Sequence, residues 1–381
     1  FNEEAVMTSN SNLHWKFGNE AAHVCEDIKE YDIDKVRSNI GSNGCIVIGG
    51  PPCQAYSMAG RGKLKSLGEE RIHTNDPRGY YYLDFINHAL ELEAKAVVME
   101  NVPESTDFGG LNIPQTVCEI LEDNGYIAVW SVLNSADYGV PQLRNRVFVV
   151  AIKKGNSGKF EFPEATHGPK DETIQNNIKF YNRRFIEFRN YMQSCGSNNR
   201  DYLKNWVTVE DAISDLPSLM KNSASKFQNR GINLCMDYRT ESQNEFQHMM
   251  KNWYGFDNKV VSGNVFRKTE RDFIIFENMK PGDNYTDASL IADEILSSKV
   301  KDICEYTNKD THDYEYEKIK NMIIPPYSRD KFENKWKRLY TDRPSHTVTA
   351  HLGKDTYSHI HPWEPRGISV REAARLQSFP D

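Results

Sequence analysis

Short apolar runs alternate with segments of helical periodicity in the first part of the chain. Four runs have the length of buried strands: Gly44–Ile48, Ala94–Met99, Tyr126–Leu133 and Val147–Ile152. Tyr80–Glu93, between the first two runs, carries apolar residues at the spacing of an amphipathic helix. Strands separated by helices are typical of α/β proteins. We therefore predict an α/β fold with a doubly wound, mostly parallel sheet.

The first apolar run leads into a turn that contains a cysteine. Gly49–Ser57 reads Gly-Gly-Pro-Pro-Cys-Gln-Ala-Tyr-Ser, and its glycines and prolines stop the strand. We expect Cys53 on a loop at the carboxyl end of this strand, where open α/β sheets bind their ligands. Backbone N–H groups or cations nearby would favour its thiolate form. A lone cysteine is more often a buried structural residue, but the Pro-Pro-Cys-Gln context favours a nucleophile.

Three more motifs follow along the chain. They are Met99–Pro103 (Met-Glu-Asn-Val-Pro), Gln142–Arg146 (Gln-Leu-Arg-Asn-Arg) and Arg371–Pro380 (Arg-Glu-Ala-Ala-Arg-Leu-Gln-Ser-Phe-Pro). Together with Gly49–Ser57, and in this order, they resemble the motifs of the cytosine carbon-5 methyltransferases. The resemblance implies a Rossmann-like class I methyltransferase fold with a second, smaller target-recognition domain. It also implies an enzyme of restriction–modification type that methylates carbon 5 of cytosine in a specific double-stranded DNA sequence.

The resemblance assigns roles to four catalytic residues. Cys53 would attack carbon 6 of cytosine, while Glu100 holds or protonates N3 so that negative charge does not build up on the ring. Arg146 would reach O2 of the base, and Arg144 would support the loop and the phosphate side. Alternation along the strand that follows predicts both arginine side chains on one face. Because a stacked cytosine hides carbon 6, the base must be flipped out of the duplex.

The resemblance also implies S-adenosylmethionine as the methyl donor. Val24–Ile28 looks like the end of a strand, where Asp27 would accept a hydrogen bond from the adenine amino group. Ile28 would pack on the adenine ring, and Pro52 is expected to contact the cofactor as well.

The polar stretch after Cys53 has little periodicity, which is typical of a functional loop. In the family this loop closes over the flipped base. The catalytic-loop residues that we expect here are Gln54, Ser57 and Arg61.

Two parts of the family's cofactor pocket do not occur in the sequence. They are the Phe-x-Gly-x-Gly loop and the helix that follows Phe-Pro-Asp. Ala5, Thr8 and Asn12 fit the family's Ala-x-x-Thr-x-x-x-Asn helix. We therefore expect the sequence to start and stop inside the nucleotide-binding fold, with the remaining parts supplied by a longer protein or by a second chain.

The motifs divide the chain into three segments. We expect a catalytic domain at 1–154, a target-recognition domain at 155–365, and a segment at 366–381 that returns the chain to the catalytic domain. The middle segment is polar and rich in asparagine, and Val207–Pro217 resembles the start of the family's recognition domain. Its length is compatible with sequence-specific readout of DNA.

Composition limits the partners and the compartment. The net charge of −7 does not by itself indicate nucleic-acid binding, but Gln142–Gly155, Lys179–Lys204 and Arg329–Arg343 are locally basic. Each stretch alone could be a solvated face, whereas all three beside these motifs favour contacts with the phosphates of double-stranded DNA. The 7 cysteines show no metal-ligand spacing, so we expect no metal site and a reducing cytoplasm. No apolar run is long enough for a membrane span. We expect a monomer, and a cognate restriction endonuclease stays open as a further partner.

Two other functions stay open on the sequence alone. One is a tRNA cytosine-5 methyltransferase, although its recognition domain is generally smaller than the segment at 155–365. The other is a catalytically inactive DNA-binding module, which the missing glycine loop supports and the presence of Cys53 and Glu100 opposes. At the level of single residues, Glu100 could instead cap the next helix, and Arg144 and Arg146 could face solvent.

Overall fold

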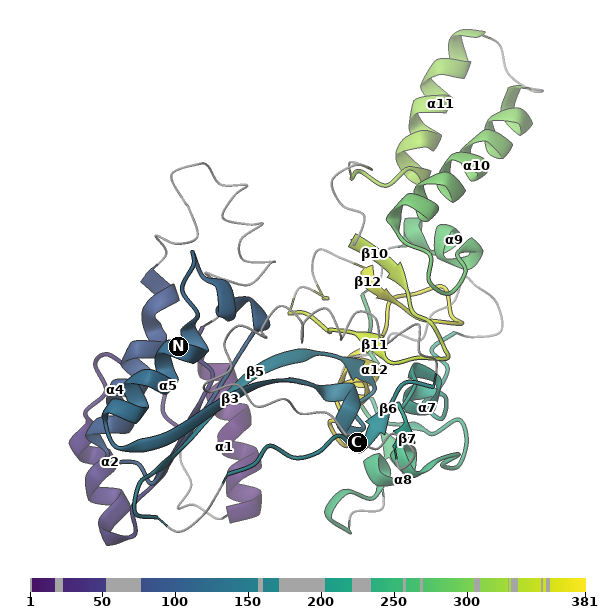
Figure 1. Ribbon diagram of the computed structural model, residues 1–381. Coiled ribbons are helices and arrows are strands. Elements are labelled where there is room, and N and C mark those ends of the chain that lie inside the picture. The colour runs from purple at the N-terminus through teal and green to yellow at the C-terminus, as the bar shows by residue number, and fades with distance from the viewer. Residues whose placement is uncertain are drawn as a thin grey trace. The chain divides into compact units, whose positions relative to one another are not determined.

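The computed structural model divides into two compact units (Figure 1). The first unit contains described residues within 1–133 and 145–164, and the second contains those within 134–144, 165–173 and 197–381. The residues that the structure describes are 2–17, 23–52, 77–156, 160–170, 203–220, 234–255, 258–267, 270–304, 309–327, 329, 335–350, 352–353 and 357–381.

A mixed sheet forms the centre of the first unit. Its strands are β1 (Ile46–Gly49), β2 (Ala96–Asn101), β5 (Asn145–Lys153) and β3 (Tyr126–Asn134), in this spatial order. β1 runs parallel to β2, and β2 runs antiparallel to β5. Each strand overlaps one of the four apolar runs, so the predicted α/β class is confirmed.

One face of this sheet carries the core of the first unit. Successive β2 residues alternate in burial, and Val97 and Met99 are 0% exposed, because neighbouring side chains on a strand point to opposite faces. Helices α4 (Tyr81–Glu91) and α5 (Ile113–Asp123) pack their apolar stripes into the same cluster. Each fully buried aliphatic side chain of this kind contributes about 1.5–3 kcal/mol.

β1 lies at the edge of the described sheet. Ile46 and Ile48 on this strand are 62% and 73% exposed, whereas strands of parallel sheets are usually covered on both faces. At the end of the strand, a Cβ on Gly49 would lie 2.6 Å from the ring of Phe85 on α4. A glycine is therefore required where the chain leaves β1 and enters the Pro-Pro-Cys turn.

The N-terminal part contains helices α1 (Glu3–Phe17) and α2 (Ile33–Ile40). α1 covers the segment in which a helix was expected. The predicted strand at Val24–Ile28 is wrong: the chain is irregular there and then turns, with the Asp27 carboxylate accepting from Lys29 N at 3.0 Å. No described strand pairs with this segment, so nothing holds it in an extended ladder.

The second unit consists of short strand pairs and helices. Its helices are α7 (Val209–Ile213), α8 (Glu245–Lys251), α9 (Glu270–Asn278), α10 (Tyr285–Cys304), α11 (Lys309–Ile323) and α12 (Val370–Arg375). The strand pairs are β4 (Gln142–Leu143) with β11 (Ser345–His346), β6 (His167–Gly168) with β7 (Lys204–Asn205), β8 (Met236–Asp237) with β9 (Val260–Val261), and β10 (Trp336–Arg338) with β12 (Tyr357–Ile360). Strands this short give little stability by themselves, so side-chain packing must hold the unit together.

An aromatic cluster provides much of that packing. The Phe276 ring makes edge contacts with the rings of Trp336 and Tyr357, both at 4.9 Å between centroids. Tyr285, at the start of α10, joins the cluster with its ring 5.5 Å from Trp336. α10 and α11 lie side by side (Figure 1). Edge-to-face pairs add about 0.5–1.5 kcal/mol each beyond the burial of their area.

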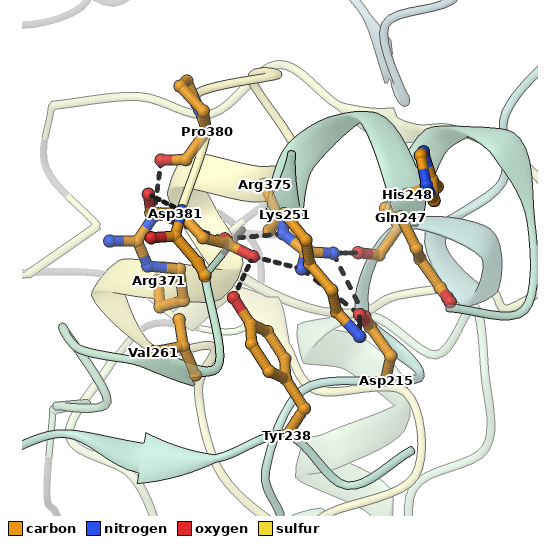
Figure 2. A network of polar contacts seen from close by, with 12 residues as sticks. Asp215, Tyr238, Gln247, His248, Lys251, Val261, Arg371, Arg375, Pro380 and Asp381 are labelled. Atoms are coloured by element: carbon orange, nitrogen blue, oxygen red, sulfur yellow. Dashed lines mark hydrogen bonds and ion pairs between the residues drawn. The ribbon is translucent and has the colours of Figure 1, made fainter. Parts of the chain in front are cut away.

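A buried network of ion pairs joins α7, α8 and α12 (Figure 2). Asp215 lies 3.0 Å from Lys251 Nζ and 3.1 Å from Arg375 Nη1, and its side chain is 0% exposed. Arg375 also binds the Asp381 carboxylate, which accepts from the Tyr238 hydroxyl at 2.8 Å. Burial alone would lower the pKa of Arg375, but Asp381 and Asp215 raise it above its ordinary value. The guanidinium therefore stays charged and ties three helices together.

None of the helices in the described ranges is long and apolar enough to cross a membrane. Within the same ranges, His, Cys, Asp and Glu side chains form no group that could hold a metal ion.

Candidate active site

Glu100 lies at the carboxyl end of β2, beside the turn that leads toward Cys53. The parallel register pairs Gly49 of β1 with Met99 of β2, so Gly50 follows opposite Glu100. A Cβ on Gly50 would lie 3.2 Å from Glu100 Oε2, which shows how closely the carboxylate approaches this turn. The Glu100 side chain is 37% exposed. A ligand at this edge of the sheet can therefore reach the carboxylate.

Arg146 binds the Glu100 carboxylate from the neighbouring strand. Arg146 Nε lies 2.7 Å from Glu100 Oε1, and the Arg146 side chain is 18% exposed. The antiparallel register places Phe148 opposite Glu100, and Arg146 stands two residues away on the same face of β5. A second donor, Arg146 Nη1, binds Asn145 O at 2.7 Å. The two contacts fix the arginine over the strand end.

Arg144 does not share a strand with Arg146, so the prediction that alternation along one strand aligns the two side chains is wrong. β4 ends at Leu143 and β5 begins at Asn145, with Arg144 in the break between them. By its contacts Arg144 belongs to the second unit, where its carbonyl accepts from Ser135 N at 3.0 Å. β4 pairs with β11 and not with the strands of the central sheet. The apolar run Val147–Ile152, which predicted β5, gave no sign of this separate pairing.

Asn101, next to Glu100, was not singled out from the sequence. Its side chain is buried, with Nδ2 donating to Pro51 O at 3.2 Å and Oδ1 accepting from Val102 N at 2.8 Å. The available signal was the pair of prolines on the neighbouring strand end, since a turn without N–H groups makes fewer backbone bonds to β2 and depends more on side chains.

The residues expected at the cofactor stand on the surface of the first unit. Ile28 is 38% exposed, and Pro52 is exposed at the last described position before Cys53. Next to them, Lys29 Nζ lies 3.9 Å from Asp84 on α4 and 4.8 Å from the Tyr81 ring centre. These contacts anchor the turn that carries Asp27. The other predicted residues of the site lie outside the described residues: Cys53, Gln54, Ser57 and Arg61.

A family model described as C-5 cytosine-specific DNA methylase matches residues 10–381. The chain belongs to this family. The family and the class of enzyme predicted from the motifs are thereby confirmed, and the family implies a DNA substrate. The methylase fold also accounts for the observed sheet, in which Glu100 lies beside the turn at Gly50–Pro52.

Individual proteins resemble this methylase over most of its length. A protein of Oceanobacillus iheyensis named as the type II methyltransferase M.OihORF3336P is 48% identical over 391 residues, which cover 99% of the chain and 81% of the relative. The type II methyltransferase M.AgeI of Thalassovita gelatinovora is 27% identical over 94% of the chain and 81% of its own length. The similarity to proteins named type II methyltransferases thus extends along nearly the whole chain.

A solved structure supports the fold. A crystal structure of an Escherichia coli protein, described as a DNA modification methyltransferase encoded within a prophage, superimposes with a TM-score of 0.58. The match covers 100% of this methylase and 80% of that chain at 18% identity, so it bears on the fold alone.

Proposed function

We propose that this methylase transfers a methyl group from S-adenosylmethionine to carbon 5 of cytosine within a specific double-stranded DNA sequence, through base flipping and a covalent bond to Cys53. The observation that carries the proposal is the Glu100–Arg146 ion pair of 2.7 Å beside the Gly50–Pro52 turn that leads into Cys53. Addition to a cytosine ring requires a nucleophile, a group that holds a proton at N3 and a donor to O2, and we assign these roles to Cys53, Glu100 and Arg146.

The reaction proceeds by nucleophilic addition and elimination. The Cys53 thiolate forms a bond to carbon 6, and the electron pair of the C5–C6 bond moves toward carbon 5 and N3. Glu100 holds a proton at N3, which keeps negative charge from building up on the ring. Arg146 keeps the Glu100 carboxyl group oriented and donates to O2. After carbon 5 is methylated, it loses its proton to a base, the C5–C6 double bond re-forms, and Cys53 leaves as a thiolate. The proton at N3 then returns to Glu100.

The cofactor would contact Asp27, Ile28 and Pro52, all of which belong to the first unit. Asp27 carries a carboxylate that can accept from an adenine amino group, although it also accepts from Lys29 N at 3.0 Å. Ile28 offers an apolar surface of the kind that stacks on a purine. The carboxylate acceptor and the apolar side chain fit the adenine of S-adenosylmethionine, which would supply the methyl group.

Sequence recognition would rest on the segment at 155–365. Backbone phosphates fix the register of a protein on DNA, and contacts to base edges read the sequence. Exchanging this segment for that of a relative should change the methylated sequence and leave Cys53 as the nucleophile. Methylation of the original site after the exchange would contradict this division.

Methyl transfer can be measured with the complete gene product and S-adenosylmethionine labelled in the methyl group. The expected result is label in 5-methylcytosine of duplex DNA, at one sequence on bisulfite mapping, and none in tRNA. Label in tRNA alone would establish the RNA-modifying alternative. Specific DNA binding without label in either nucleic acid would establish the inactive module and overturn the proposal.

A further inference from the structure

The turn before Cys53 lacks the bonds that normally extend a parallel ladder. β1 pairs with β2 up to Gly49 and Met99, and the same register would bring Pro51 opposite Asn101. Prolines have no N–H group, so Pro51 and Pro52 cannot donate to β2. By backbone bonds alone, the chain would separate from β2 two residues before the cysteine.

The Asn101 side chain supplies a bond between β2 and this turn that does not need a proline N–H group. Its Nδ2 donates to Pro51 O at 3.2 Å, while its Oδ1 accepts from Val102 N at 2.8 Å. Asn101 is 1% exposed and Pro51 is buried, so water does not compete for these groups. An asparagine is needed because the amide both donates and accepts, whereas a carboxylate only accepts.

We propose that Asn101 is the positioning residue that sets Cys53 against Glu100 for addition to the base. The proposal rests on the proposed function of Cys53. Asn101 follows Glu100 directly on β2, and Glu100 is itself fixed by Arg146 at 2.7 Å. One side chain thus joins the strand that carries the carboxyl group to Pro51, two residues before Cys53 in the sequence. Because the rate of addition depends on the placement of reacting atoms within about 1 Å, loss of this bond slows the covalent step.

The test measures how fast the protein becomes bonded to a duplex in which 5-fluorodeoxycytidine replaces deoxycytidine, with S-adenosylmethionine present. The complete gene product is used, as wild type, Asn101→Ala and Asn112→Ala. Asn112 is the matched control: it is 8% exposed, lies in the same unit and caps α5 by accepting from Gln115 N at 3.1 Å. Melting temperature and affinity for unmodified DNA are measured on each variant.

We expect Asn101→Ala to form the adduct on the order of 100-fold more slowly, with DNA affinity close to that of wild type. Asn112→Ala should lose melting temperature and keep the wild-type rate of adduct formation. Adduct formation by Asn101→Ala at the wild-type rate would overturn the inference alone. So would equal rate losses in both variants, which would mean that the rate follows stability. Absence of any adduct with the wild-type protein would overturn the proposed function and this inference with it.

Asn101→Asp adds a readout that a purely structural role would not give. The new carboxyl group keeps an acceptor for Val102 N but, when ionised, has no donor for Pro51 O. Its protonated form can donate, so the adduct rate relative to wild type should rise as the pH falls. A ratio that stays constant with pH would contradict the role of the donor.

Discussion

Asp137 offers a quantitative test of the packing in the second unit. It lies in the short 3₁₀ helix Ser135–Tyr138, which precedes β4, and its carboxylate accepts from Trp206 Nε1 at 2.9 Å. Burial raises the pKa of Asp137 from its ordinary value of 3.8 to about 6, against the opposing effect of the Trp206 hydrogen bond. Folding therefore favours the protonated carboxyl group.

The sign and size of the effect on stability follow from this pKa. A folded pKa above the unfolded one means that the folded protein binds the proton more tightly, so stability falls as the pH rises from about 4 to about 6. A pKa difference of about 2, at about 1.36 kcal/mol per unit, corresponds to about 3 kcal/mol. Asp137→Asn keeps an acceptor for Trp206 and removes the charge. It should gain up to about 3 kcal/mol at about pH 8 and nothing at about pH 4.

Urea unfolding across this pH range measures the difference between wild type and Asp137→Asn. Trp206→Phe serves as the companion variant, because it removes the donor that stabilises the carboxylate. Its loss of stability should be larger at about pH 8 than at about pH 4. A stability difference between wild type and Asp137→Asn that does not change with pH would mean that folding does not raise the pKa of Asp137.

Three further changes test other parts of the account. Gly282→Ala should destabilise the second unit by more than about 1 kcal/mol in thermal unfolding. Gly282 has φ +95°, and a Cβ at this position would lie 2.3 Å from the Tyr340 ring. An unchanged melting temperature would contradict this close contact between Gly282 and Tyr340. Asp215→Asn should cost about 3–5 kcal/mol in urea unfolding, since it leaves the buried Lys251 and Arg375 cations short of a partner. The exposed Lys204–Glu245 pair is the control, and Glu245→Gln should leave the unfolding midpoint unchanged. Glu100→Gln should keep DNA binding and lose about 10²–10⁴-fold in methyl-transfer rate, because an amide cannot transfer a proton to N3; an unchanged rate would exclude the proposed role.

The sheet could be predicted because burial leaves a strong signal in short strands. The run Ala94–Met99 became β2, Ala96–Asn101, since its alternate side chains fill the core between the sheet and two helices. That Glu100 lies near the end of a strand, next to the turn at Gly50–Pro52, followed from the same signal, because parallel strands end at a common edge. The roles of Glu100 and Cys53 themselves came from the resemblance in their motifs.

Other features depend on partners that are remote in the sequence. Val24–Ile28 has the composition of a strand end, but no described strand pairs with it and Asp27 closes a turn instead. Arg144 leaves the strand of Arg146 because β4 pairs with β11, about two hundred residues further along. Likewise, Asp215 and Arg375 are separated by 160 positions, and their charges alone gave no sign of a buried pair.

The central claim is that Cys53 forms a covalent bond to cytosine, and one measurement tests it directly. The complete gene product is incubated with S-adenosylmethionine and duplex DNA that carries 5-fluorocytosine, whose fluorine cannot leave carbon 5 as a proton does. After denaturation and digestion, mass spectrometry should find the modified base bonded to the peptide that contains Cys53, and Cys53→Ala should give no adduct and no methylation while still binding DNA. An adduct at Cys25, Cys45 or Cys118, or normal methylation by Cys53→Ala, would contradict the account.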